Sequence, residues 1–349
     1  MRICLALMMA SLLVLPAAYA GDPGAKLEWS AKAYGDGEHN AFTDITRWKD
    51  AYYLCFRNGL SHGSTDGEIR IMRSNDFRDW TPVETIRTLG DDRDPHFCAT
   101  PERLFVYFGV WSLRHTEGDK PPQRDSVRSC VSWTDNGTDW ASPKAFYEPR
   151  WWTWRVIEHE GTFYGAAYTA YRPTPPGREL RLLTSHNGID WEFRTSVATE
   201  RGPSESDMWF DEAGHMHIVT RMTDKTNLAF HYESVPALDT WSATPLGAII
   251  HSPAVARWNG RVFVAGRGKG ENGWVTRLWE LRDGKAEELL TLPSGGDTSY
   301  PGLMPDPGAP TDGPPALLIS WYSQHARDEE PDATRNTASV HVGRIVVAK

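Results

Sequence analysis

The chain has 349 residues, of which 40% are hydrophobic, and a formal net charge of −9 at pH 7. This length and hydrophobic content are enough to bury a sizeable core. The negative charge argues against a nucleic-acid partner, because phosphate binding requires a dominant basic surface.

The N-terminal segment has the pattern of a secretory signal peptide. An apolar run over residues 3–15 leads to the small-residue pattern Ala-Tyr-Ala, which ends at Ala20, so we expect cleavage after that residue. The run is shorter than the ~20 apolar residues that a membrane-spanning helix needs, and no lipid-anchor pattern precedes Cys4. We therefore expect a secreted or periplasmic protein with no insertion into a membrane.

The cysteine pattern predicts thiols rather than disulfides. Removal of the signal peptide would leave Cys55, Cys98 and Cys130, an odd number that cannot form a complete disulfide framework. No Cys-x-x-Cys pair or His/Cys cluster suggests zinc. We expect all three thiols to be buried in strands.

One pattern of three strands recurs six times after the signal segment, in units of about fifty residues. In chain order the expected strands are 41–48, 51–59 and 67–80; 94–100, 103–111 and 126–140; 154–160, 162–171 and 178–191; 205–212, 215–222 and 227–241; 252–258, 261–268 and 274–284; and 299–305, 316–324 and 338–347. The runs are rich in β-branched and aromatic residues, and Gly, Asp or Asn separates them. No long helical periodicity interrupts them.

Six near-equal units predict an all-β fold, a six-bladed β-propeller formed by residues 21–349 as a single domain. The last unit lacks a fourth strand of its own. We expect residues 26–33 to supply that strand and to close the ring, which would remove an exposed sheet edge.

Two positions in the units carry most of the polar side chains that could form a site. Starts of first strands supply Asp44, Asp94, Arg155, Glu205 and Tyr300, and ends of second strands supply Arg57, Arg221, Arg267 and His325. In a propeller the first strand of each blade lines the centre, and its start lies at the same face as the end of the second strand. We therefore expect these side chains to share one basin.

Three of the units contain a similar turn, at 74–80, 135–140 and 184–191. These turns resemble the Asp-box pattern S-x-D-x-G-x-x-W, in which Asp or Asn binds backbone amides, Gly supplies a positive φ and Trp packs on the blade. None is a complete copy, because Trp133 stands where Ser is expected and His186 stands in place of Asp. We expect all three to be structural.

The turns, the six units and the signal segment together resemble the sialidase superfamily, also called BNR-repeat or neuraminidase-like, over residues 25–349. The resemblance implies an exo-acting glycoside hydrolase that cleaves terminal, anionic sugars from glycans or glycoconjugates. Arginines of that family bind the sugar carboxylate, a glutamate activates a tyrosine nucleophile and an aspartic acid protonates the leaving oxygen. We expect a monomer that requires no metal or organic cofactor.

The family's site residues carry over to specific positions of this chain. They are Tyr300 for the nucleophile, Glu205 for the activating glutamate, Arg221 and Arg267 for the second and third arginines, and Asp66 for the acid/base. His62 lies in the loop of Asp66 and is a further candidate for sugar binding.

One part of the family pattern is missing. Where the family has its first arginine, in an R-I-P motif, this chain has Phe42-Thr43-Asp44. Arg57 or Arg155 could replace that arginine, and Asp44 is a second candidate for the acid. The chain is therefore expected to be a divergent member whose sugar differs.

Two other functions are compatible with the same residues. Arg93-Asp94-Pro95 is similar to a motif of five-bladed glycosidases, so Asp44, Asp94 and Glu205 could act as a carboxylate triad on neutral sugars. Alternatively, the arginines and tryptophans could form a carbohydrate-binding propeller without catalysis.

Overall fold

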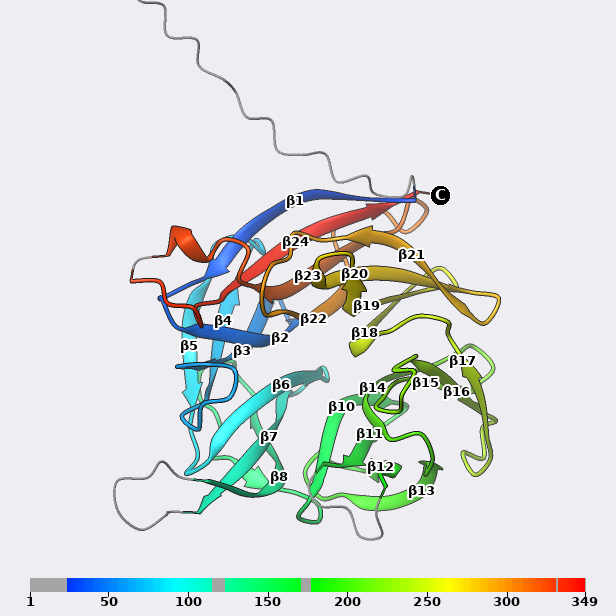
Figure 1. Cartoon of the computed structure of the whole chain (residues 1–349). Helices are drawn as coiled ribbons and strands as arrows, with labels where there is room; N and C mark the ends of the chain where they lie inside the picture. The colour runs from blue at the N-terminus through cyan, green and yellow to red at the C-terminus, as the bar shows by residue number, and fades with distance from the viewer. Residues whose placement is uncertain (1–23, 115–122, 171–176, 331, 349) are drawn as a thin grey trace, which may run out of the picture.

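The computed structural model describes residues 24–114, 123–170, 177–330 and 332–348. Within these ranges twenty-four strands form six four-stranded antiparallel sheets, arranged as blades around a central axis (Figure 1). The six-bladed β-propeller expected from the repeat is therefore confirmed.

Blades 1 to 3 follow one another along the chain, each with its first strand nearest the axis. Blade 1 consists of β2 (His39–Trp48), β3 (Ala51–Gly59), β4 (Glu68–Ser74) and β5 (Thr81–Ile86). Blade 2 consists of β6 (Asp91–Ala99), β7 (Leu104–Arg114), β8 (Gln123–Thr134) and β9 (Lys144–Ala145). Blade 3 consists of β10 (Trp151–His159), β11 (Thr162–Thr169), β12 (Leu180–Ser185) and β13 (Glu192–Ala198).

Blades 4 to 6 complete the ring. Blade 4 consists of β14 (Pro203–Phe210), β15 (Met216–Met222), β16 (Phe230–Ser234) and β17 (Trp241–Pro245). Blade 5 consists of β18 (His251–Trp258), β19 (Arg261–Gly270), β20 (Gly273–Arg282) and β21 (Lys285–Thr291). Blade 6 consists of β22 (Thr298–Pro305), β23 (Ala316–Ser323), β24 (Ser339–Val347) and β1 (Ala25–Tyr34), with a short 3-10 helix, η1 (Arg327–Glu329), before β24.

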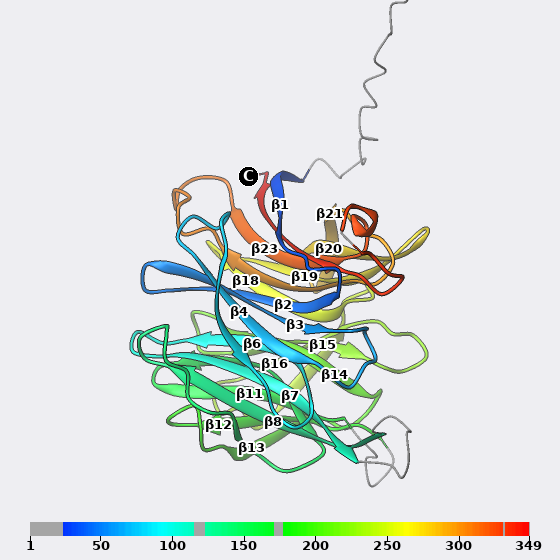
Figure 2. The same cartoon turned by 90° about the vertical axis from the view of Figure 1, so that its left-hand side faces the viewer.

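The ring closes by pairing the first and last strands of the described chain. Strand β1 runs antiparallel to β24, from Ala25 opposite Val347 to Tyr34 opposite Val340, and both views show the two strands side by side (Figures 1 and 2). The fourth strand expected from residues 26–33 is thus in place. Blade 6 gains an outer strand that covers the edge of β24.

The innermost strand of every blade contains a β-bulge near its start. The register shifts lie at residues 41–44, 93–96, 153–156, 203–206, 251–254 and 299–302. Non-glycine residues with left-handed backbone in these bulges include Phe42 (φ 59°), Asp94 (φ 52°), Ser252 (φ 50°) and Tyr300 (φ 48°). Such conformations cost about 1–3 kcal/mol each and gather at functional sites. The bulges therefore change the direction of the side chains near the start of each innermost strand.

The three similar turns hold their hairpins through one side chain each. Asp76, Asn136 and Asn187 each accept bonds from two backbone amides that follow them, at 2.8–2.9 Å. These bonds show that all three turns have a structural role, as expected.

The expected alignment of the second and third turns is wrong by one residue. In the second turn Thr134, rather than Trp133, takes the serine position and bonds Asn136 at 3.1 Å. In the third turn Ser185 takes the serine position and bonds Asn187 at 3.1 Å, so Asn187, rather than His186, stands at the Asp position. Thr and Asn preserve the local bonds of the pattern, which explains why these turns form without its usual residues.

The remaining expectations concern the cysteines and the N-terminus. Cys55, Cys98 and Cys130 are free and buried, which confirms the expected thiols. Among the described residues, no helix is long and apolar enough to cross a membrane. The expected signal peptide, residues 1–20, lies outside the described residues.

Candidate active site

Tyr300 and Glu205 form a hydrogen-bonded pair between blades 6 and 4. The Tyr300 hydroxyl donates to Glu205 Oε1 over 3.0 Å, and Nη1 of Arg221 donates to the same oxygen over 2.6 Å. The strained bulge of blade 5 aims the amide of Ser252 at Glu205 Oε2, 2.8 Å away. Three separate blades therefore fix the position of this carboxylate.

The charge states of the pair follow from their surroundings. Burial works to raise the pKa of Glu205, but Arg221, His251 and the Ser252 amide outweigh it and hold this pKa below its ordinary value. Burial, followed by the negative charge of Glu205, raises the pKa of the Tyr300 phenol well above its usual range. A protonated phenol therefore faces an ionised carboxylate that can accept its proton.

A cavity of about 240 Å³ opens beside this pair. Its wall is formed by Phe42, His62, Arg93, Asp94, Trp111, Arg124, Trp152, Trp154, Tyr168, Ala170, Arg178, Glu205 and Tyr300. Phe42, Asp94, Trp154 and Tyr300 come from the bulges of the innermost strands. The cavity is smaller than the roughly 300–1,000 Å³ typical of drug-sized ligands, and aromatic side chains form much of its wall. We call it the axial pocket.

Asp94 is the second carboxylate that lines the axial pocket. Its Oδ1 is buried and has no hydrogen-bond partner, and Nε of Arg93 lies 3.5 Å from its Oδ2. Burial, reinforced by the negative charge of Glu205, raises the pKa of Asp94 to about 6 despite the attraction of Arg93. A carboxyl group with this pKa can hold a proton near neutral pH and donate it.

The four arginines expected to bind the sugar carboxylate do not line the axial pocket. Each instead pairs with an acid of the fold: Arg57 with Asp91 at 3.0 Å, Arg155 with Asp44 at 2.9 Å, Arg221 with Glu205 at 2.6 Å and Arg267 with Asp297 at 2.9 Å. Arg57 is also completely buried. The arginines are close to the centre, as expected, but their guanidinium groups already have carboxylate partners.

Two expected acids also lie away from the axial pocket. Asp44 is bound by Arg155 and by the amide of Phe97, at 2.9 Å in both cases. Asp66 turns back on its own loop and accepts the amide of Leu60 at 3.2 Å. The structure brings Asp94, Glu205, Tyr300 and His62 together in the pocket wall, and it leaves Asp44 and Asp66 outside it.

Three arginines that the repeat did not single out line the pocket instead. Arg93 precedes Asp94 on β6, Arg124 lies on β8 and Arg178 lies just before β12. Arg93 could have been found through the Arg-Asp-Pro motif. Arg124 and Arg178 lie at the starts of third-strand segments, where no type of polar residue recurs from one unit to the next.

Asp297 is the centre of a network at the rim of the axial pocket. Its Oδ1 accepts Arg267 at 2.9 Å and Tyr322 at 2.8 Å, and its Oδ2 lies 2.9 Å from Nε2 of His39 and 2.6 Å from Nδ1 of His62. Burial opposes ionisation here, but the two histidines and Arg267 lower the pKa of Asp297 far below its ordinary value. The sequence offered no signal for this residue.

The same network contains the set of side chains in the described residues that could hold a metal ion. Potential ligand atoms of His39, His62 and Asp297 lie within 4.8 Å of one another, and two histidines with one carboxylate can bind a divalent transition metal. Both oxygens of Asp297 already accept hydrogen bonds, and Arg267 lies 2.9 Å from one of them. A cation would have to displace the protons that His39 and His62 share with Asp297, and it would lie close to the positive charge of Arg267. These three side chains therefore fit an internal hydrogen-bond network better than a metal site.

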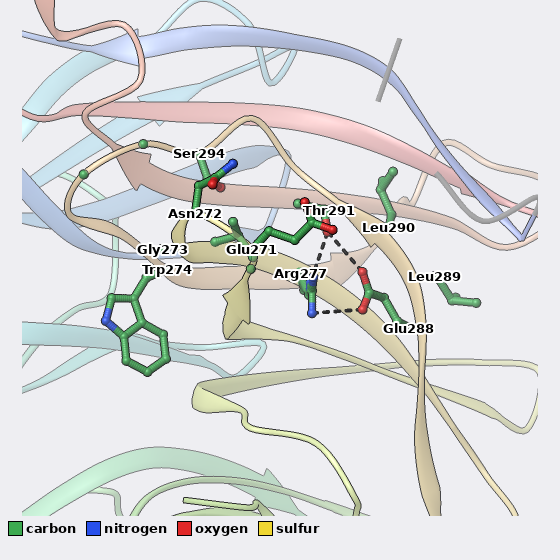
Figure 3. A pocket seen from close by; sticks show the side chains of 14 residues that line it. Glu271, Asn272, Gly273, Trp274, Arg277, Glu288, Leu289, Leu290, Thr291 and Ser294 are labelled. Atoms are coloured by element: carbon green, nitrogen blue, oxygen red, sulfur yellow. Dashed lines mark hydrogen bonds and ion pairs between the residues drawn. The ribbon is translucent and has the colours of Figure 1, made fainter. Parts of the chain in front are cut away.

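A larger cavity, of about 750 Å³, lies along β20 and β21 of blade 5. Figure 3 shows Arg277, Glu288 and Thr291 bound to one another in its wall, with Arg277 2.9 Å from Glu288. Trp274 lies apart from them in the same view. The described residues that line this cavity include no tyrosine, histidine or aspartate, whereas Tyr300, Glu205 and Asp94 meet in the axial pocket, so we place the candidate chemistry there.

Comparison with solved structures places the fold among known propellers. A protein of unknown function from Dyadobacter fermentans DSM 18053 matches with a TM-score of 0.76 and 17% identity, over 94% of this chain and 100% of that one. Trypanosoma rangeli sialidase in complex with the inhibitor DANA matches with a TM-score of 0.63 and 15% identity, over 88% of this chain. The fold is sialidase-like.

The endosialidase of phage phi92 also matches, with a TM-score of 0.64 and 10% identity over 92% of this chain. The chain spans 55% of the trypanosomal sialidase and 69% of the endosialidase. At these identities the likeness concerns the fold. No protein-family model and no curated protein sequence matches the chain.

Proposed function

We propose that the protein is an exo-acting glycoside hydrolase of the sialidase type, which removes a terminal sugar from a glycan in the axial pocket. The observation that carries the proposal is the Tyr300–Glu205 hydrogen bond of 3.0 Å in the pocket wall. A phenol whose proton is accepted by a carboxylate is an activated nucleophile. The sialidase-like fold supports the same reaction class.

In the proposed reaction the Tyr300 oxygen attacks the anomeric carbon, and its proton passes to Glu205. Asp94 is the proposed acid: it gives its proton to the glycosidic oxygen as the bond to the leaving group breaks. Water then releases the sugar from Tyr300, with Asp94 accepting the water's proton and Glu205 returning the phenolic proton. Asp94 replaces Asp66 and Asp44 in this role because it lines the pocket.

The deciding experiment combines turnover with trapping of the sugar–enzyme bond. Aryl glycosides of anionic and neutral sugars would be screened, and mass spectrometry would locate the label left by a fluorosugar inactivator of the best substrate's configuration. We expect the label on Tyr300 and loss of turnover in Tyr300→Phe. Tyr107→Phe is the matched control, because this buried hydroxyl bonds Gly188 O, at 2.7 Å, away from the pocket.

A second candidate function uses the two carboxylates without the tyrosine. Asp94 and Glu205 line the same pocket and could act as acid and base on a neutral sugar. Full turnover in Tyr300→Phe, together with loss in Glu205→Gln, would establish this mechanism instead. Saturable sugar binding with no product from any glycoside would favour a carbohydrate-binding propeller.

We also propose that the protein is exported and acts outside the cytoplasm as one propeller domain. The proposal is supported by the apolar run at residues 3–15 and the Ala-Tyr-Ala pattern that follows it. N-terminal sequencing of the protein from expressing cells would test it, with a mature chain that begins at Gly21 as the expected result.

A further inference from the structure

Three guanidinium groups surround one buried carboxylate beside the axial pocket. Asp91 is completely buried; its Oδ1 lies 3.0 Å from Arg57, and its Oδ2 lies 3.4 Å from Arg93 and 2.7 Å from Arg124. Buried charges are normally matched by opposite charges. One carboxylate cannot neutralise three guanidinium groups, so this cluster has an excess of positive charge.

The groups nearby do not remove the excess. The other acid next to Arg93 is Asp94, whose Oδ2 lies 3.5 Å from Nε of Arg93, so two carboxylates face three guanidinium groups and one positive charge remains in excess. In the described residues, Arg178 forms no ion pair; its guanidinium lies 5.5 Å from the ring centre of Tyr168. Nε of Arg124 is buried without a hydrogen-bond partner. Free donor capacity therefore remains on this side of the pocket.

The opposite side of the centre is balanced. Arg221 is matched by Glu205 and Arg267 by Asp297, and neither guanidinium lines the pocket. An incoming anion would have to compete there with carboxylates already in place.

Aromatic rings also contact two of the arginines that share Asp91. The guanidinium of Arg124 lies 5.1 Å from the ring centre of Trp111, and that of Arg93 lies 4.8 Å from the ring centre of Phe42. Cation–π contacts of this kind orient a guanidinium and leave its edge free to bind an oxyanion.

We propose that Arg93, Arg124 and Arg178 form an anion subsite of the axial pocket, which binds a carboxylate or sulfate group carried by the sugar. The position of the subsite limits where that group can be attached. The ring of Phe42 contacts both Arg93 and Tyr300, with its centre 5.1 Å from the Tyr300 ring centre. The arginine within hydrogen-bond distance of the Tyr300 hydroxyl is Arg221, at 3.3 Å, rather than Arg93, so a group bound by Arg93 would lie apart from the phenol.

The substrate class follows from this separation. The anion is attached away from the anomeric carbon, as in a uronic acid or a sugar sulfate ester, rather than on the anomeric carbon itself, as in a 2-keto acid such as sialic acid. This assignment of the substrate rests on the proposed function. The subsite itself can be tested independently, through the affinity of the protein for anionic sugars.

The test measures binding of free sugars to the wild-type protein, because a free sugar has no glycosidic bond to hydrolyse and turnover cannot interfere. Calorimetric titration would compare glucuronic acid, glucose 6-sulfate, glucose and N-acetylneuraminic acid, each at low and high salt. We expect glucuronic acid or glucose 6-sulfate to bind at least about tenfold more tightly than glucose, since a hydrogen bond to a charged group contributes more than a neutral one. The preference should weaken at high salt.

Variants then assign the preference to the subsite. Arg124→Gln and Arg178→Gln should each reduce the affinity for the anionic sugar about tenfold and should reduce the affinity for glucose much less, so that the ratio of the two affinities falls. Arg103→Gln is the matched control, because Arg103 pairs with Asp135 at 2.6 Å on the exposed rim of the same blade as Arg124.

Each outcome decides the proposal. Equal affinity for glucuronic acid, glucose 6-sulfate and glucose would overturn it, as would strongest binding of N-acetylneuraminic acid that depends on Arg221 or Arg267. Anion binding that depends on Arg124 and Arg178, with no glycoside hydrolysed by the wild-type protein, would support the subsite and reject the hydrolase. The two proposals can therefore fail separately.

Discussion

The guanidinium of Arg155 lies 2.9 Å from the carboxylate of Asp44, and blade 3 is thereby joined to blade 1 across the centre of the propeller. Arg155 also donates to Pro301 O of blade 6 at 2.9 Å and to Pro253 O of blade 5 at 3.3 Å. A residue that could have been a substrate ligand thus ties four blades together.

This arrangement predicts that Arg155 stabilises the fold. We expect Arg155→Met to lower the free energy of unfolding by ~3–5 kcal/mol, because it leaves Asp44 as an unpaired buried charge. The loss should be smaller in the Arg155→Met, Asp44→Asn double variant. Urea denaturation of the single and double variants would measure it, and equal losses in both would contradict the structural role.

Asp94 should set the alkaline limit of activity. The acid must be protonated when the leaving group departs, and its pKa is raised to about 6. We therefore expect kcat/KM to fall as pH rises through about 6. In Asp94→Asn this limb should disappear, and the rate should remain measurable only for glycosides with activated leaving groups, which need no acid. Unchanged dependence on the leaving group would exclude Asp94 as the acid.

The same carboxyl group should make the folded protein less stable at neutral pH. Its pKa in the folded state is about 6, above the ~3.9 of an unfolded chain. The favourable contribution of the protonated form is fully present below about pH 4 and is lost as pH rises through about 6. Asp94→Asn should therefore raise the free energy of unfolding by ~1–3 kcal/mol at pH 8 and leave it unchanged at pH 4. A stability difference that is independent of pH would contradict this account.

The contribution of Asp297 to the stability of the folded protein should have the opposite dependence on pH. Its pKa is depressed, so its contribution is present above the ordinary aspartate pKa near ~3.9 and is lost as pH falls further. Asp297→Asn should lower the melting temperature strongly at pH 7, because Arg267 loses its ion pair. Thermal melts between about pH 3 and 7 would show the difference between wild type and variant shrinking in acid. Asp135→Asn, at an exposed pair, is the matched control.

The sequence predicted the architecture well because features that are local along the chain specify the strands and turns of a propeller. Strand composition, turn residues and spacing are all short-range, and they located the innermost strands whose bulges carry Tyr300, Asp94 and Phe42. Glu205 and Tyr300 share the first-strand position in different blades, which implies convergence, and their side chains form a hydrogen bond.

The partners of the charged groups could not be predicted in the same way. Whether Arg267 faces substrate or Asp297 depends on a hydrogen bond that spans thirty residues, and no repeat position marks Asp297. Arg124 and Arg178 reach the pocket from third-strand segments, where no polar side chain recurs from blade to blade to indicate a shared site. The direction in which Asp66 turns is likewise set by a bond to Leu60 inside its own loop.

The pairing of β1 with β24 has a consequence for how the protein reaches this fold. The strand that is synthesised first has its partner among the strands that are synthesised last, at Ala25 and Val347. Contacts so distant along the chain form slowly, because a long loop must close before they can stabilise anything. Until β24 pairs with β1, the ring is open and does not hold the blades of Tyr300 and Glu205 in register, so the Tyr300–Glu205 pair should assemble in the final step of folding rather than gradually.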